Sequence, residues 1–169
     1  MSQGEIMYLK SNEYKRSTNS DRSKHNQNQR IVMQGITGIN EKTRLKMTII
    51  SSGNYCANSV NYLFLKDSKY DIKYLLGLFN SKLSNWFYKT MSTNSNVNGY
   101  EVDNLPILIC DIEKQAQIGD LVDDILNFKR LRLDENEDRI QKLETKIDHT
   151  VYKLYGLTPE EIEIIDRKS

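Results

Sequence analysis

The stretch DIKYLLGLFNSKLSNWFYK, from Asp71 to Lys89, decides the fold. Its large apolar side chains recur at steps of three and four residues, which is the spacing of one face of a helix. The residues on that face are Ile72, Leu75, Leu76, Phe79, Leu83, Trp86 and Phe87. We therefore predict a helix over this stretch, and we expect its wide apolar face to lie against a sheet formed by the preceding residues.

Three short runs with the composition of strands precede this helix. They are RIVMQGITGI beginning at Arg30, RLKMTII beginning at Arg44 and NSVNYLFLK beginning at Asn58. Clusters of Gly, Asn and Ser separate the runs and favour turns. The sequence thus predicts three strands on which the helix can pack.

The middle run alternates apolar and polar residues. A strand places residues two apart on the same face, so one face would hold Leu45, Met47 and Ile49. The opposite face would hold Arg44, Lys46 and Thr48. We expect this outer face to be cationic, and it is either a binding surface or simply the solvated side of a half-buried strand.

A polar stretch, TMSTNSNVNGYEVDNLPI, follows the helix. It is too rich in Asn, Ser and Thr to form a core, so we predict a loop. Pro106 disfavours a helical conformation at Leu105. We therefore expect the loop to lead into a strand from Ile107 to Cys110.

Two helical stripes occupy the rest of the chain. The first contains Ile118, Leu121, Val122, Ile125 and Phe128, and the second contains Ile140, Leu143, Ile147, Val151 and Leu154. The second stripe steps by three, four, four and three residues, as in the seam of a coiled coil. Gly156 is typical of a helix C-cap, and Thr158 followed by Pro159 is typical of the start of a last short helix.

These patterns predict an α+β fold. A small β-rich domain with a packed helix would occupy residues 1–110, and within it residues 10–30 would form a flexible basic arm, because they contain one apolar side chain, Tyr14. Residues 111–169 would form long helices that serve as a spacer, an interaction region or a coiled-coil arm. The two stripes would pack on another domain or on each other, or on a second copy of the chain to give a homo-oligomer.

The formal net charge of +1 hides an uneven distribution. Residues 1–70 contain 11 basic and 5 acidic side chains, whereas residues 111–169 contain 10 basic and 15 acidic ones. Such a division favours a basic part that meets a polyanion and an acidic part that meets solvent or protein. The basic arm is then either a solvated loop or a segment that follows a phosphate backbone.

Several function classes are excluded by what the sequence lacks. It has no apolar run of the roughly 18 residues that span a bilayer, so we expect no membrane partner and a cytoplasmic location. Cys56 and Cys110 stand alone, without the spacing of a zinc site. The sequence also lacks a glycine-rich cofactor loop and the Asn-Pro-Pro-aromatic run of adenine methyltransferases. We therefore predict no catalytic residue, no metal site and no cofactor in this chain.

Three stretches resemble a known family. They are LLGLFNSKLSNWFYK, STNSNVNGYEVDNLPI and KIDHTVYKLYGLTPEEIEII. In their residues and in their order along the chain, they resemble the C-terminal part of a family of bacterial enzymes. These are the adenine-specific DNA methyltransferases of type II restriction-modification systems, which end in the TaqI-like C-terminal specificity domain. The resemblance covers residues 30–165, and the ending from Val151 to Thr158 is its most distinctive element.

The resemblance implies a target-recognition domain that positions double-stranded DNA for a methyltransferase or nuclease domain of the parent enzyme. S-adenosylmethionine is then the expected cofactor of that parent enzyme. Whole family members carry these catalytic domains upstream, so we expect Met1 to mark a split subunit or a shortened form without independent activity. The alternative is a protein-interaction or oligomerisation module with no DNA role.

A recognition domain needs cations for phosphates and amide or guanidinium groups for base edges. The candidates for phosphate contacts are Lys15, Arg16, Arg22, Lys24, Arg30 and Lys42. The candidates for base contacts are Gln34, Arg44, Lys46, Asn94, Asn96 and Asn98. Asn is also favoured in turns, so a purely structural role for the three asparagines stays open.

Overall fold

The computed structural model describes residues 21–57, 59–65, 69–131 and 136–168, with residues 21–23 described in their backbone alone. The fold is α+β, as predicted. Its elements in chain order are the 3-10 helix η1 (Asp21–Gln27), the strands β1 (Arg30–Gln34), β2 (Met47–Ile50) and β3 (Val60–Leu63), and the helices α2 (Ile72–Asn80), α3 (Lys82–Met91), α4 (Gly99–Asp103), α5 (Ile112–Leu131), α6 (Glu137–Tyr155) and α7 (Pro159–Lys168).

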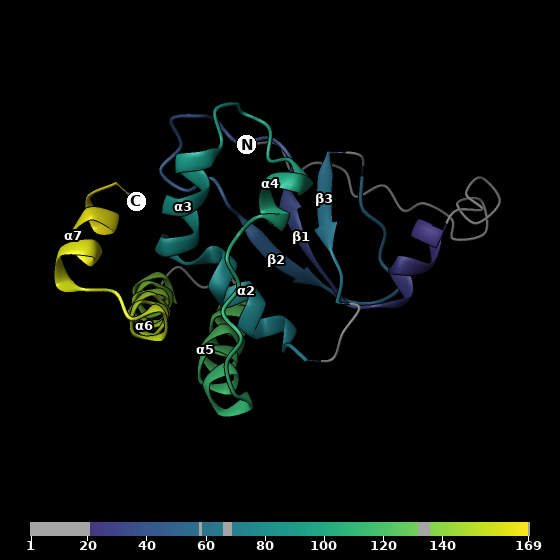
Figure 1. Cartoon of the computed structure of the whole chain (residues 1–169). Coiled ribbons are helices and arrows are strands. Elements are labelled where there is room, and N and C mark those ends of the chain that lie inside the picture. The colour runs from purple at the N-terminus through teal and green to yellow at the C-terminus, as the bar shows by residue number, and fades with distance from the viewer. Residues whose placement is uncertain (1–20, 58, 66–68, 132–135, 169) are drawn as a thin grey trace.

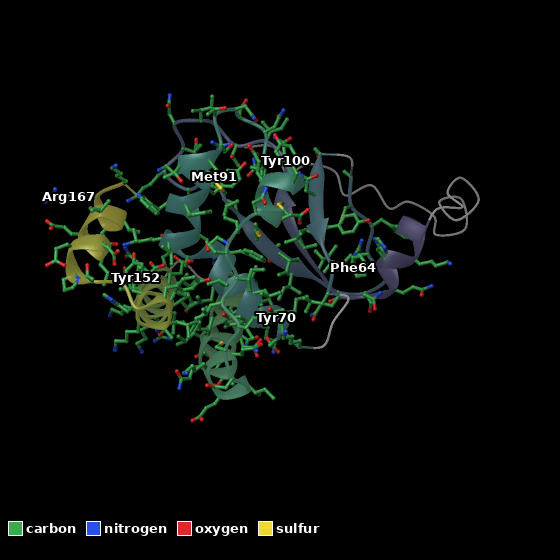
Figure 2. The ribbon with its side chains drawn as sticks, in the orientation of Figure 1. Phe64, Tyr70, Met91, Tyr100, Tyr152 and Arg167 are labelled. Atoms are coloured by element: carbon green, nitrogen blue, oxygen red, sulfur yellow. The ribbon has the colours of Figure 1, made fainter. Side chains whose placement is uncertain are left out.

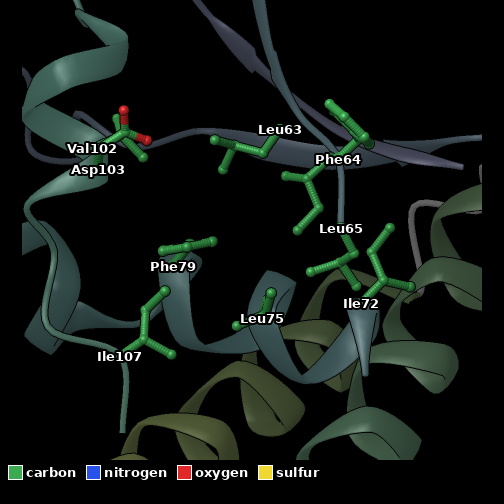
Figure 3. A pocket seen from close by; sticks show the side chains of 10 residues that line it. Leu63, Phe64, Leu65, Ile72, Leu75, Phe79, Val102, Asp103 and Ile107 are labelled. Atoms are coloured by element: carbon green, nitrogen blue, oxygen red, sulfur yellow. The ribbon is translucent and has the colours of Figure 1, made fainter. Parts of the chain in front are cut away.

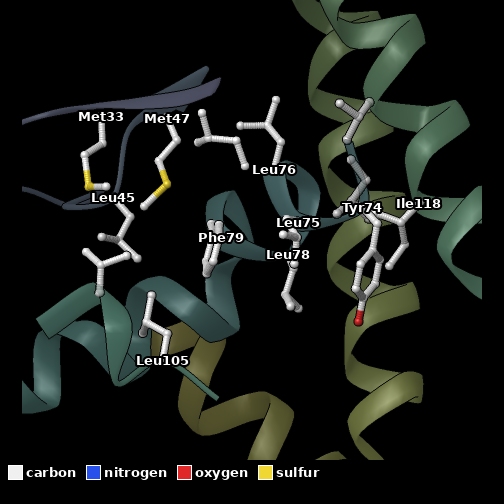
Figure 4. Packing of buried hydrophobic residues seen from close by; sticks show 14 of the residues in the cluster. Met33, Leu45, Met47, Tyr74, Leu75, Leu76, Leu78, Phe79, Leu105 and Ile118 are labelled. Atoms are coloured by element: carbon white, nitrogen blue, oxygen red, sulfur yellow. The ribbon is translucent and has the colours of Figure 1, made fainter. Parts of the chain in front are cut away.

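The three predicted strands form one antiparallel sheet in the order β2-β1-β3. In the central strand, Val32 lies opposite Thr48 of β2 and Tyr62 of β3. Its neighbours Ile31 and Met33 are buried and belong to the hydrophobic core. Helix α2 covers this face of the sheet, and Figure 4 shows its side chains beside the methionines of β1 and β2.

The predicted helix from Asp71 to Lys89 is divided into α2 and α3 at Ser81, whose backbone is extended with φ −63° and ψ 155°. The Ser81 hydroxyl donates to the carbonyl of Leu78 at 2.7 Å and accepts from the backbone N–H of Ser84 at 3.3 Å. These local bonds replace the helical ladder. The single helix was therefore wrong in one respect, because the periodicity of apolar residues does not reveal a serine that caps both neighbours.

The C-terminal helices share the core of the sheet. Helix α5 packs on α2, where Gly77 allows a close approach: a Cβ added there would lie 2.5 Å from Cγ2 of Ile118. Helix α6 packs on α5 and also contacts α2 and α3. In the predicted coiled-coil stripe, Ile147 and Val151 are buried and the other three residues are half-buried against the core. The partner of this stripe is therefore the chain itself.

The strand predicted from Ile107 to Cys110 is wrong. This segment has no strand partner among the described residues and links α4 to α5 without regular secondary structure. Tyrosine hydroxyls bind its backbone instead: Tyr74 donates to the carbonyl of Leu108 at 2.8 Å, and the N–H of Leu108 donates to Tyr155 at 3.2 Å. Side chains of α2 and α6 thus satisfy the polar groups that a ladder would satisfy.

Helix α6 ends and helix α7 begins as the sequence predicts. Gly156 closes α6 in the left-handed conformation, with φ 68°. The N–H of Thr158 then donates to Glu161 at 2.8 Å, and the N–H of Glu161 donates back to the Thr158 hydroxyl at 3.3 Å. After this turn α7 lies along α3, so that the end of the chain marked C in Figure 1 comes close to α3.

Within the described residues, no helix is both long and apolar enough to cross a membrane.

Candidate nucleic-acid interface

Two loops lie side by side at one end of the sheet, at the top of Figure 1. One connects β1 to β2 (residues 35–46) and the other connects α3 to α4 (residues 92–98). The N–H of Thr37 donates to the carbonyl of Ser95 at 2.8 Å, and the N–H of Val97 donates to that of Gly35 at 2.9 Å. We call these segments the paired loops, because backbone hydrogen bonds join them into one surface.

Arg44 holds the paired loops together and does not lie on the outer face where the alternation placed it. Strand β2 begins only at Met47, and Arg44 is 1% exposed. Its Nε donates to the hydroxyl of Thr37 at 2.8 Å, and its Nη2 donates to the carbonyl of Asn94 at 2.7 Å. The expectation of an exposed Arg44 was wrong because the period of two applies only inside a strand.

Helix α3 fixes the position of this arginine. The guanidinium lies 5.3 Å from the centre of the Tyr88 ring. The side-chain oxygen of Asn85 accepts the N–H of Arg44 at 2.9 Å and that of Leu45 at 2.8 Å. Two side chains from successive turns of α3 therefore hold the backbone and the side chain of the first loop.

The second loop is fixed through Glu101, a buried carboxylate of α4. Its Oε2 accepts the Tyr88 hydroxyl at 2.9 Å and the N–H of Asn98 at 3.2 Å. Burial raises the pKa of Glu101, but the hydrogen bonds from Tyr88, Asn98 and Ser92 outweigh it and hold the pKa below its ordinary value. The carboxylate is therefore ionised at neutral pH and remains a strong acceptor.

The three predicted asparagines all lie in this second loop, and most of their polar groups serve the loop itself. The Asn94 side chain accepts the N–H of Asn96 at 2.8 Å, and the carbonyl of Asn96 lies 3.2 Å from the Tyr88 hydroxyl. Asn98 precedes α4 as its N-cap residue. Asn94 and Asn98 are half-buried, whereas Asn96 is exposed. The backbone role of asparagine therefore explains most of the cluster, and Asn96 presents its amide to solvent.

Three further predicted residues are exposed at or near the paired loops. Gln34 ends β1 and its N–H donates to the carbonyl of Lys46 at 3.4 Å. Lys46 is exposed and pairs with Glu41 at 3.5 Å. Lys42 is exposed in the first loop. The pairing of the loops thus brings Asn96 to the same end of the molecule as Gln34, Lys42 and Lys46, although at least 50 residues of sequence separate it from them.

Arg30, predicted as a phosphate contact, is instead 3% exposed. Its guanidinium lies 5.3 Å from the centre of the Tyr62 ring and donates to the carbonyl of Asn54. As the first residue of β1 it lies at the opposite end of the strand from Gln34. Arg30 therefore holds the loop after β2 in place and is not available to a ligand in this conformation.

Among the arm cations other than Arg30, Lys24 is the one whose side chain the structure describes, and it does not lie at the paired loops. Lys15 and Arg16 lie outside the described residues, and Arg22 belongs to η1 without a described side chain. Lys24 is exposed on η1, which Figure 1 shows on the far side of β3. The helix is held against β3 by His25, whose Nδ1 lies 3.0 Å from the Tyr62 hydroxyl.

Exposed apolar side chains accompany the amides of the paired loops. Ile36 is 60% exposed beside Asn96, with which it forms an isolated bridge. Tyr100, in the first turn of α4, is 66% exposed, and Figure 2 shows it near Met91 at the same end of the molecule. Tyr74 and Tyr88, by contrast, are fully buried and serve packing. The surface thus combines amide, cationic and apolar groups.

An apolar hollow of about 180 Å³ lies elsewhere, between β3 and α2 (Figure 3). Its lining includes Phe64, Leu75 and Phe79, with Asp103 as the one charged residue among the described residues around it. A single carboxylate among hydrocarbon side chains does not form an acid–base pair. In the described parts of the chain, no group of three or more His, Cys, Asp or Glu is placed to hold a metal ion.

The chain matches a known protein family. The family model of the TaqI-like C-terminal specificity domain matches residues 5–107. The chain belongs to this family. The matched region contains the sheet, α2 to α4 and both of the paired loops. Helices α5 to α7 lie beyond the match, although α5 and α6 contribute buried residues to the core of this specificity domain.

A solved structure has a similar fold. It is that of the Type IIL restriction-modification enzyme MmeI in complex with DNA, with a TM-score of 0.66 and 13% sequence identity. The match covers 89% of this specificity domain chain and 21% of the MmeI chain, so the present chain spans about a fifth of the length of that enzyme. A comparison with curated protein sequences found no match.

Sequence reasoning missed the two residues that organise the paired loops from α3 and α4. Glu101 follows Asn98 by three residues, which is the spacing of a capping box and is a readable signal. Asn85 has no such signal, because its partners Arg44 and Leu45 lie about 40 residues earlier in the chain.

Proposed function

We propose that this chain is the target-recognition module of a type II restriction-modification adenine-specific DNA methyltransferase, and that it reads double-stranded DNA with the paired loops. The observation that carries the proposal is the fixed surface of these loops within a specificity-domain fold. Arg44 joins the loops from within, at 2.8 Å from Thr37 and 2.7 Å from Asn94. A reading surface needs such fixed geometry, because base contacts discriminate only when donors and acceptors are already in place.

The exposed side chains of the paired loops suit base edges. Amides such as those of Gln34 and Asn96 can bond adenine at two points, and Lys46 can donate to guanine. Ile36 and Tyr100 offer apolar surface for a thymine methyl group or a base face. Lys42, exposed in the first loop, suits a phosphate. These groups belong to one surface, as DNA recognition requires.

The division of labour follows from the chemistry. Methylation of an adenine in a duplex requires that the base leave the stack and enter a catalytic pocket, and a second lobe must hold the surrounding DNA. We assign that second lobe to this chain. The partner of this chain is then the catalytic domain of the parent enzyme, which binds S-adenosylmethionine. Any cleavage of DNA by that enzyme would be carried out by its other domains. Residues 1–110 would recognise the target, and residues 111–169 would act as the helical spacer.

The proposal is tested with the 169-residue chain in two steps. Selection from a random duplex library first identifies the preferred sequence. Affinities for that sequence and for single-base changes are then measured for the parental chain and for the Gln34→Ala/Asn96→Ala variant. We expect the variant to lose discrimination by about 1–3 kcal/mol at the positions that these amides contact. The matched control is Gln141→Ala on the exposed face of α6.

The outcomes separate the proposal from its alternative. Loss of discrimination in the loop variant, with discrimination retained in the control, supports recognition by the paired loops. A parental chain that shows no duplex preference and instead forms stable oligomers supports an interaction module and overturns the proposal. Calorimetry with S-adenosylmethionine tests the division of labour, because binding to this chain alone would contradict it.

A further inference from the structure

Lys89, in the last turn of α3, connects two segments that are far apart in the sequence. Its Nζ donates to the backbone carbonyl of Lys42 at 3.3 Å and to that of Lys168 at 2.8 Å. Lys42 belongs to the first of the paired loops, and Lys168 to the last turn of α7. The Lys89 ammonium therefore lies against the backbone of two further lysines, and we call Lys42, Lys89 and Lys168 the lysine cluster.

The positive charge of the lysine cluster is not neutralised by ion pairs among the described residues. Nearby cations have carboxylate partners: Lys46 pairs with Glu41 at 3.5 Å, Lys82 pairs with Asp166 at 2.9 Å, and Arg167 pairs with Glu163. Within the part of the chain that the structure describes, the ion pairs include none of the three cluster lysines. Backbone carbonyls do not neutralise the Lys89 ammonium, and the exposed side chains of Lys42 and Lys168 add two positive charges at neighbouring backbone positions.

Helix α7 is anchored so that Lys168 has a defined position. Asp166 accepts the ammonium of Lys82 at 2.9 Å and the Tyr152 hydroxyl at 3.1 Å. Burial raises the pKa of Asp166, but these two hydrogen bonds outweigh it and hold the pKa below its ordinary value. Ile165 is buried in the same turn. The ionised carboxylate of Asp166 thus attaches the last turn of α7 to α3 and α6.

We propose that Lys42, Lys89 and Lys168 form a phosphate-contact surface for the DNA backbone next to the bases that the paired loops read. This inference rests on the proposed function and extends it, because Lys168 lies 61 residues beyond the end of the family match at residue 107. The acidic C-terminal part of the chain then contributes to DNA binding through the basic last turn of α7.

The position of the lysine cluster favours a duplex backbone as its ligand. Lys42 is part of the first paired loop, and Lys89 precedes the second loop, which starts at residue 92. The cluster is therefore continuous with the surface assigned to base contacts. Phosphates flank every base of a duplex, so a protein that reads base edges meets the backbone at the margin of its reading surface. Lysine is suited to this role as a flexible point charge.

The test compares two double variants of the 169-residue chain on the preferred duplex at several salt concentrations. Lys42→Gln/Lys168→Gln removes two charges of the cluster while it leaves Lys89 and its backbone contacts in place. The matched control is Lys146→Gln/Lys153→Gln on the exposed face of α6. Each lost phosphate contact lowers the slope of log affinity against log salt by about 0.9, so we expect a decrease of about 1.8 in the cluster variant and no change in the control. Base preference and the unfolding temperature should stay unchanged in both.

Acetylation of lysines provides a second measurement that needs no substitution. The chain is labelled with an amine-reactive acetyl donor with and without the duplex, and labelling at each lysine is measured by mass spectrometry. We expect the duplex to protect Lys42, Lys89 and Lys168, but not Lys146 or Lys153.

The results distinguish this inference from the proposed function. If the parental chain binds no duplex, both fail. A second outcome is that the parental chain binds with its full base preference, the cluster variant keeps the parental salt slope, and the cluster lysines remain unprotected. The phosphate contact of the lysine cluster is then overturned, and recognition by the paired loops stands. A smaller slope together with protection of the cluster establishes the backbone contact.

Discussion

The Nη2 of Arg44 donates to the backbone carbonyl of Asn94 at 2.7 Å, across 50 residues of sequence. The bond joins the two loops that carry the proposed reading surface, and it is made by a side chain that is itself buried. A hydrogen bond from a charged donor inside a protein is stronger than one at the surface. Arg44 is therefore a positioning residue, which acts on the ligand through the shape of the loops.

Replacement of this arginine should loosen the loops. We expect Arg44→Met to lower the free energy of unfolding by about 2–4 kcal/mol, because the Thr37 hydroxyl and the Asn94 carbonyl lose a charged partner. Hydrogen exchange at the backbone N–H groups of Thr37 and Val97 should accelerate. Chemical denaturation and exchange mass spectrometry measure the two effects. The control is Lys46→Met on the exposed neighbour, and equal exchange rates in the two variants would contradict the positioning role.

The contact of α2 with α5 provides a matched pair of glycine substitutions. Gly77→Ala places a methyl group 2.5 Å from Cγ2 of Ile118 and 3.0 Å from Cγ2 of Val122, so we expect it to destabilise the chain by about 1–3 kcal/mol. Gly119→Ala on α5 meets its nearest atom at 3.6 Å and should stabilise the chain by up to about 1 kcal/mol, because alanine favours a helix. Thermal unfolding should shift in opposite directions. A shift of the same sign and size in both would show that the helices are not closely packed.

A charge placed in the apolar stripe of α6 should destabilise the chain, because the stripe is part of the hydrophobic core. Ile147→Asp buries a carboxylate without a partner, and we expect a loss of about 3–5 kcal/mol in the free energy of unfolding. The exposed neighbour Lys146→Asp is the control and should change stability by less than about 1 kcal/mol. Circular dichroism follows unfolding, and light scattering follows the mass in solution. A change of mass with unaltered stability would place the stripe between two copies of the chain.

Asp148 predicts a dependence of stability on pH. Burial raises the pKa of this carboxylate in the folded chain, although its Oδ1 accepts the backbone N–H of Lys82 at 2.8 Å. A raised folded pKa means that the folded state binds the proton more tightly than the unfolded state. Stability from this group is therefore present at acid pH and is lost as the pH rises from the ordinary value of 3.8 through the folded pKa.

The variant Asp148→Asn tests this sign. It keeps an oxygen that accepts from Lys82 but has no charge to desolvate. We expect it to be at least as stable as the parental chain at pH 7, and its advantage should disappear at a pH below the ordinary aspartate value. Denaturation at several pH values measures the difference. A variant that is less stable at pH 7 than at pH 3, relative to the parental chain, would reverse the assignment.

Local patterns predict the elements of this fold well. The strands near Arg30, Arg44 and Asn58, the helical stripes and the cap at Gly156 all follow from periodicity or from one residue's backbone preference. Patterns fail where side chains replace the backbone ladder. Ser81 divides a continuous apolar face, and the hydroxyls of two tyrosines take the place of a strand partner. These bonds depend on residues that become neighbours only in the folded chain.

The candidate site was less predictable than the fold. Gln34, Lys42, Lys46 and Asn96 were named from their chemistry, and the structure places them on one surface. The same reasoning predicts Arg44 and Arg30 as DNA contacts, but both are buried. A guanidinium that can bind a phosphate can also stack on an aromatic ring and donate to a backbone carbonyl. The sequence does not predict the lysine cluster. Residues 111–169 are acidic on average, and this average gives no sign of the basic last turn of α7.

The contact between Lys89 and the last turn of α7 spans 79 residues. A contact between residues so far apart in the sequence forms late in folding. The two ends of the long intervening segment must meet before the contact can stabilise the chain. During synthesis the sheet, α3 and the first paired loop leave the ribosome well before α7 does. An unfinished chain would therefore carry the paired loops without the third lysine, and the contact proposed for the lysine cluster would form only after α7 has been synthesised.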